Sequence, residues 1–239
     1  MAKKSPTARE EWHKNVFVSF RYPTDLIQSK LPEGMEVVPF IDGEEQFALV
    51  SIWYFYQQNA RTWPNMTPHW MGKLAQSPDV HVHTYVKNNQ GVAGIFCFKI
   101  WMSKTAACWM GRKFFNAPMY AARQSCIENG STIKYTSTCE NPDTKNQENT
   151  VLEYQLSGEL IFPEDDSLEE FLTDKFVRRQ YTFFNNQVNF VDNEFPKRKV
   201  SSIEIVNFES NLLQSVLDLP EVPHCSAIAI ENTICVAFN

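Results

Sequence analysis

Four side chains that can bind or transfer a proton alternate along one short stretch of the sequence. They occupy every second position and are Asp79, His81, His83 and Tyr85. The positions between them hold two valines and one threonine. Because successive side chains of a β-strand point to opposite faces, the four share one face of a predicted strand. We expect this face to line an interior hollow, and the functional predictions depend on that placement.

His81 and His83 form a His-x-His pair whose imidazoles would lie about 7 Å apart on the strand. That separation allows the two to share a zinc or another divalent ion. A transition-metal site needs further ligands, which Asp79, His69 or His224 would have to supply. The wall of a small-molecule pocket explains the pair more simply, so we predict no metal and no cofactor.

Lys113, next to Arg112, is the candidate catalytic residue. A free lysine has a pKa of about 10.4, so its amine is almost fully protonated at pH 7. A lysine that forms a Schiff base needs a much lower pKa, which burial and a neighbouring cation can provide. Arg112 is such a cation in the sequence. The alternative is that both side chains belong to a solvated helix face.

The strand that follows the histidines adds further candidates. Lys99 and Trp101 are expected on one face with Cys97, where Lys99 is either a cavity cation or an exposed residue. The planar guanidinium of Arg123 suits a carboxylate; alternatively, Arg123 and its neighbour Tyr120 only fasten a helical segment to the sheet. The residues predicted to bind a ligand are His81, His83, Tyr85, Lys99, Tyr120 and Arg123.

Composition and charge exclude several classes of protein. The chain has 239 residues, 43% of them hydrophobic, and can bury a full core. Its net charge of −6 argues against a nucleic-acid partner, which would need a basic face. There is no long apolar run and no apolar signal segment, so we expect no membrane partner and no secretion. The six cysteines lack Cys-x-x-Cys spacing, which indicates reduced thiols and a cytoplasmic location.

Alternating apolar residues predict most of the remaining elements. The block 79–123 is predicted as a strand, a turn, a second strand over 92–102 and a helical segment interrupted near Pro118. A capping box at Ser167–Glu170 begins a predicted helix, and residues 57–77 are predicted to be a long loop of the kind that forms lids. Other strands are predicted over 12–22, 35–40, 47–56, 132–139, 152–162, 181–191, 200–208 and 226–238.

These elements predict the fold class. About eight to ten strands with two or three helices indicate an α+β domain built on a mostly antiparallel sheet, closed like a barrel or cone, with flanking helices. We expect residues 1–11 to be a flexible N-terminus and residues 12–239 to form a single domain.

Three blocks of the sequence, 20–55, 79–123 and 169–183, resemble the DUF2071 family of uncharacterised bacterial proteins. That family is similar in fold to acetoacetate decarboxylase, whose closed sheet encloses an active-site cavity. The resemblance implies an acetoacetate decarboxylase-like domain with an interior cavity for a small carbonyl or carboxylate compound. It also implies a lyase-, hydratase- or aldol-type reaction at Lys113, and it favours a homo-oligomer.

The chain also departs from these relatives. The family usually has Asn and Arg where this sequence has His81 and His83. No carboxylate in 47–55 matches the cavity glutamates of the decarboxylase, and its substrate-binding arginine falls near Asn15. Only Arg112-Lys113 lies about where the decarboxylase has its lysine pair. A non-catalytic small-molecule-binding protein and a metal-dependent protein that uses His81 and His83 therefore remain alternatives.

Overall fold

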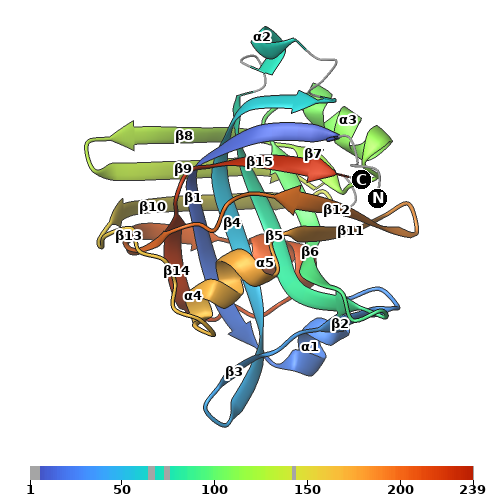
Figure 1. Cartoon of the computed structure of the whole chain (residues 1–239), viewed down its shortest axis with the longest axis vertical. Coiled ribbons are helices and arrows are strands. Elements are labelled where there is room, and N and C mark those ends of the chain that lie inside the picture. The colour runs from blue at the N-terminus through green and yellow to red at the C-terminus, as the bar shows by residue number, and fades with distance from the viewer. Residues whose placement is uncertain (1–5, 64–67, 73–75, 142–143, 239) are drawn as a thin grey trace.

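The structure is a computed structural model that describes residues 6–63, 68–72, 76–141 and 144–238. Strands dominate these residues and belong to one mixed, largely antiparallel sheet that closes on itself (Figure 1). The predicted fold class is therefore confirmed. None of the described helices is long and apolar enough to span a membrane.

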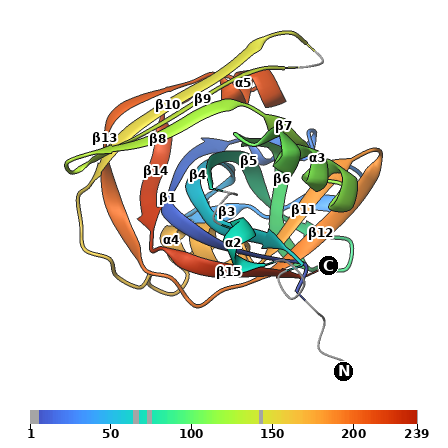
Figure 2. The ribbon, with the colours of Figure 1, turned by 90° about the horizontal axis from the view of Figure 1, so that it is seen from above.

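Seven strands close into a ring, which Figure 2 shows from above. Each strand pairs antiparallel with its neighbours, except that β6 and β11 are parallel. Around the ring the strands are β1 (Ala8–Tyr22), β4 (Glu45–Thr62), β5 (Ser77–Asn88), β6 (Ala93–Met102), β11 (Arg179–Phe184), β12 (Gln187–Glu194) and β15 (Thr233–Phe238).

A second group of strands, the outer sheet, continues from β1 and folds back over the outside of the ring (Figure 2). Its strands are β14 (His224–Ile230), β13 (Val200–Ser210), β10 (Gln147–Leu156), β9 (Thr132–Glu140) and β8 (Arg123–Asn129). One hydrophobic core lies between the two layers, and its buried members include Val18, Val82, Tyr135, Leu152 and Tyr154.

The interior of the ring holds the second hydrophobic core. At one end, four aromatic rings pack with centroid separations between 4.6 and 5.6 Å, and these rings belong to Phe40, Tyr85, Phe171 and Phe176. This packing fills that end of the ring. Polar side chains gather instead at the opposite end, beside α3 (Thr105–Phe114), which we call the α3 end.

Short elements complete the fold: α1 (Thr24–Gln28), β2 (Met35–Val37), β3 (Phe40–Asp42), α2 (His69–Gly72), β7 (Met119–Ala121), α4 (Leu168–Glu170), the π-helix η1 (Phe171–Lys175) and α5 (Leu212–Leu217). Ser167 is the N-cap as predicted, but the Glu170 carboxylate reaches the amide before it rather than that of Ser167, so the capping box is only half formed. The Ser167 hydroxyl accepts a 3.2 Å hydrogen bond from the Glu170 amide, and the Glu170 carboxylate accepts one from the Asp166 amide.

Several boundaries differ from those predicted. The first strand begins at Ala8, so residues 8–11 are paired strand rather than flexible tail. β4 continues to Thr62, into the predicted loop 57–77, of which 64–67 and 73–75 lie outside the described residues. Residues 181–191 are two strands, because Asn185 and Asn186 both adopt left-handed backbone angles and form a tight turn. After Pro118 the chain forms β7 and β8 instead of helix.

Candidate functional site

Strand β5 points its polar face into the ring. Asp79, His81, His83 and Tyr85 are all buried there, with 1%, 7%, 0% and 0% of their surfaces exposed. The apolar residues between them face the outer sheet, as Val80 and Val82 do. This separation follows from strand alternation, because β5 is paired on both sides, with β4 and β6.

A pocket of about 120 Å³ opens at the α3 end of the ring. An engineered apolar cavity of about 150 Å³ binds benzene, so this pocket suits a ligand of about five or six non-hydrogen atoms. No lysine or arginine lines it among the residues that the structure describes. The polar groups that line it are Glu10, Gln57, Asp79, His81, Gln180, Thr182 and Asn193.

Glu10 lies in the pocket wall and is held by two donors. Trp12 Nε1 donates a 2.6 Å hydrogen bond to Glu10 Oε1, and the Gln57 amide donates to Glu10 Oε2. Burial raises the pKa of the Glu10 carboxyl, and the two hydrogen bonds oppose that rise. Glu10 is not among the residues predicted from the sequence, because it lies in the segment interpreted as a flexible tail.

Asp79 is the more deeply buried carboxyl of the pocket. Burial raises its pKa well above the usual value, a hydrogen bond from Ser77 opposes the rise, and the charge of Glu10 reinforces it. The Ser77 hydroxyl donates to Asp79 Oδ1 over 2.8 Å. The two carboxyls therefore differ, because Glu10 has two donors and Asp79 has one, and this difference favours a protonated Asp79 beside an ionised Glu10.

The two histidines are neutral. Burial lowers the pKa of His81 to about 3 and that of His83 to about 3, where the neighbouring His81 adds to the effect. The Nδ1 atom of each has no hydrogen-bond partner among the described residues. His83 Nε2 lies 3.3 Å from the Tyr85 hydroxyl, which in turn lies 3.1 Å from Ser51 Oγ. A buried polar chain thus runs from His83 toward the closed end of the ring.

A β-bulge in β1 turns Asn15 into the same interior. Lys14 has a left-handed backbone angle (φ 52°), and its carbonyl accepts a 3.1 Å hydrogen bond from the Tyr135 hydroxyl of the outer sheet. Bulges often redirect a side chain in this way. Asn15 is fully buried, accepts a hydrogen bond from Trp53 Nε1 and leaves its Nδ2 unpartnered among the described residues. An uncharged amide therefore lies where the resemblance aligns an arginine.

Lys113 lies outside the pocket. It is exposed on α3, where its ammonium contacts the rings of Trp109 and Phe114, 4.8 and 5.8 Å from their centroids. Its neighbour Arg112 is half-buried. The Schiff-base role of Lys113 stays a prediction, and the burial on which that role depends is absent at this exposed position.

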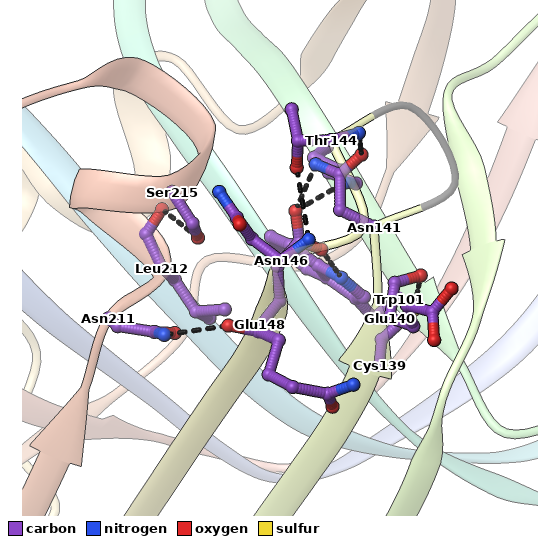
Figure 3. Close-up of polar contacts among 12 residues, drawn as sticks. Trp101, Cys139, Glu140, Asn141, Thr144, Asn146, Glu148, Asn211, Leu212 and Ser215 are labelled. Carbon is purple, nitrogen blue, oxygen red and sulfur yellow. Dashed lines mark hydrogen bonds and ion pairs between the residues drawn. The ribbon is translucent and has the colours of Figure 1, made fainter.

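Lys99 faces away from the ring interior, which corrects the predicted face. A β-bulge in β6 shifts the alternation, so that Lys99 and Trp101 point to the outer sheet while Cys97 points inward. Lys99 Nζ lies 2.6 Å from Glu148 Oε1, and both side chains are almost fully buried. Trp101 Nε1 and the Asn141 amide also donate to Glu148 (Figure 3).

The six predicted ligand-binding residues therefore fall into separate places. His81, His83 and Tyr85 lie inside the ring. The Tyr120 ring covers the Lys99 ammonium at 4.5 Å, in the layer between the ring and the outer sheet. Arg123 is exposed at the start of β8. Only the residues of β5 share a pocket or a polar chain.

The described side chains contain no group of three or more His, Cys, Asp or Glu that could hold a metal ion. His224, one of the predicted third ligands, is exposed at the start of β14. All six cysteines are free.

Comparison with known proteins agrees with this architecture. No curated protein matches the chain. Acetoacetate decarboxylase from Legionella pneumophila superposes with a TM-score of 0.64 at 11% identity, over 99% of this chain and 86% of that one. The enduracididine biosynthesis enzyme MppR complexed with pyruvate gives 0.64 at 11% identity, over 100% and 90%. An acetoacetate decarboxylase-like enzyme from Sphingomonas wittichii RW1 gives 0.57 at 8% identity, over 98% and 91%.

Identities this low establish a shared fold alone. Sequence similarity is more specific, because the profile of the DUF2071 family, described as an uncharacterized conserved protein, matches residues 9–229. The chain therefore belongs to the DUF2071 family.

Proposed function

We propose that this protein is an enzyme that moves protons on a small carbonyl compound bound at the α3 end of the ring. One observation carries the proposal: three titratable side chains with shifted pKa values line one small pocket, and they are Glu10, Asp79 and His81. Such groups gather at functional sites more often than elsewhere. The shared fold supports small-molecule chemistry, since MppR holds pyruvate.

The two carboxyls have complementary roles in this reaction. Glu10, ionised and oriented by Trp12 and Gln57, removes a proton from the carbon next to the carbonyl group. Asp79 delivers its own proton to the carbonyl oxygen as the C–H bond breaks. The product is the enol, and the proton count balances without a cofactor. Neutral His81 offers a hydrogen-bond acceptor or donor to the substrate.

The described residues fit the other assignments less well. Lys113 would have to act from the exposed face of α3. The two neutral imidazoles of β5 could bind a metal ion, but the described residues supply no third ligand. A non-catalytic binding protein would use the same pocket as the enzyme. We further propose a cytoplasmic location, which the six free cysteines support. We also propose a homo-oligomer, and this rests on the resemblance alone.

Hydrogen–deuterium exchange tests the proposal. The protein is incubated in deuterated buffer with a panel of small ketones and aldehydes, and loss of the α-proton signal is followed by NMR. We expect exchange above the buffer rate, reduced about 100-fold or more in Asp79→Asn and in Glu10→Gln. Lys113→Gln serves as the control and should exchange at the wild-type rate.

Three results would contradict the proposal. Exchange no faster than in buffer, with a ligand that binds and returns unchanged, would identify a binding protein. Loss of exchange in Lys113→Gln, together with a borohydride-trapped adduct at Lys113, would identify the Schiff-base mechanism. A stoichiometric transition metal in the purified protein would favour the metal-dependent alternative.

A further inference from the structure

The ionisable groups that line the pocket are one-sided in charge. Glu10 and Asp79 are acids, and His81 is neutral. The buried guanidinium of Arg198 lies 5.9 Å from the Trp12 ring centroid and does not line the pocket. A carboxylate ligand would meet the negative charge of Glu10 with no lining cation to offset it, whereas a cation would meet complementary charge.

The apolar walls suit the same kind of ligand. Trp12, Trp53 and Phe55 line the pocket and pack against one another, with centroid separations of 4.9, 4.6 and 5.7 Å. Aromatic faces attract cations through their quadrupole, and the indole ring does so most strongly. Recognition of ammonium groups by aromatic side chains is the best-known use of this attraction.

His81 provides an independent sign of a ligand. Only 7% of its surface is exposed, and it lines the pocket. Its Nδ1 atom has no hydrogen-bond partner among the described residues. A buried polar atom without a hydrogen bond is costly, so native structures rarely leave one unpaired. The neutral ring also keeps one nitrogen as a hydrogen-bond acceptor, to which an ammonium N–H can donate.

We propose that the substrate of this pocket carries a positive charge: it is a small amino ketone or amino aldehyde in its ammonium form. The inference rests on the proposed function for the carbonyl half of the substrate. The ammonium group would lie against the aromatic walls and Glu10, beside the His81 ring. The carbonyl oxygen would face Asp79. An adjacent ammonium group also makes the carbon acid that Glu10 deprotonates stronger.

Binding of a cation should strengthen as the pH rises, because a higher pH favours the ionised form of the carboxyls. The groups around Glu10 that can affect this dependence come from every element packed against it. Asp79 lies across the pocket, and Cys235 of β15 interacts electrostatically with both Glu10 and Arg198. On the outer side, Glu10 shares a small surface hollow with Arg9, Glu11, Asn59 and Arg61.

Calorimetric titration with three probes of similar shape tests the charge preference. The probes are propylammonium, 1-propanol and propionate, compared at constant ionic strength. We expect propylammonium to bind at least about tenfold more tightly than either of the others. Glu10→Gln should remove that preference, whereas Glu36→Gln, which deletes a surface carboxylate paired with Lys87, should leave it intact.

The outcomes separate this inference from the proposed function. Propionate binding more tightly than propylammonium, or equal binding of all three probes, would overturn the inference. If uncharged ketones exchange their α-protons as efficiently as amino ketones, the result supports the proposed enzyme and refutes the cationic substrate. If propylammonium binds selectively but no carbonyl compound exchanges its α-protons, the result supports the cation site and refutes the catalytic proposal.

Discussion

Trp12 Nε1 lies 2.6 Å from Glu10 Oε1, and this hydrogen bond joins the aromatic wall of the pocket to the carboxyl that we assign as base. The two residues belong to one strand, two positions apart, so β1 alone fixes their relation. Burial favours the protonated form of Glu10, and the indole donor is one of two contacts that oppose it.

Trp12→Phe should keep the packing of the pocket wall but raise the pKa of Glu10, because one donor to the carboxylate is lost. The base would then ionise at higher pH, so kcat/KM on the acidic side of the pH–rate profile should fall about tenfold while the alkaline side changes less. Trp101→Phe is the matched control, since its indole donates to Glu148 outside the pocket. An unshifted profile in Trp12→Phe would contradict the role of this donor.

Asp79→Asn should stabilise the fold at neutral pH. The folded-state pKa of Asp79 is raised, so the folded protein holds a proton that the unfolded chain loses above a pH of about 4. Stability therefore falls as the pH rises from that value toward the folded-state pKa, at about 1.4 kcal/mol per pH unit. Urea unfolding at pH 4 and pH 7 should show a gain for Asp79→Asn that is larger at pH 7. The exposed Asp42→Asn should show no such gain, and an equal loss for Asp79→Asn at both values would refute the argument.

His83 should make the protein sensitive to acid. Its pKa is lowered to about 3 in the fold, so the unfolded chain takes up a proton first as the pH falls below about 6.5. This contribution to the free energy of unfolding is fully present above that value and is lost progressively toward pH 3, up to roughly 5 kcal/mol. His83→Gln should flatten the dependence of the unfolding free energy on pH by about one proton between pH 6 and pH 4. His13→Gln, on a half-buried histidine beside Glu11, is the control, and a slope that matches wild type in both variants would count against this account.

The sequence was sufficient where the structure depends on local alternation and insufficient where it depends on distant pairing. The inward face of β5 follows from a period of two and was predicted residue by residue. One bulge in β6 reversed the prediction for Lys99 and Trp101, since a shift of one residue exchanges the two faces of a strand. Glu10 could not be found in this way, because its strand is defined by pairing with β15, at the far end of the sequence.

The Lys99–Glu148 pair tests whether the cation of β6 is structural. Both side chains are buried between the ring and the outer sheet, so Lys99→Met alone should destabilise the protein by about 3–5 kcal/mol, because it leaves the Glu148 carboxylate without its counter-ion. The double variant Lys99→Met, Glu148→Met should recover most of that stability, since two apolar groups can replace a buried ion pair. Urea unfolding of the single and double variants measures both effects. The double variant should also keep wild-type probe binding at the α3 end, because neither residue lines that pocket. Loss of propylammonium binding in a stably folded double variant would indicate that Lys99 contributes to ligand binding after all.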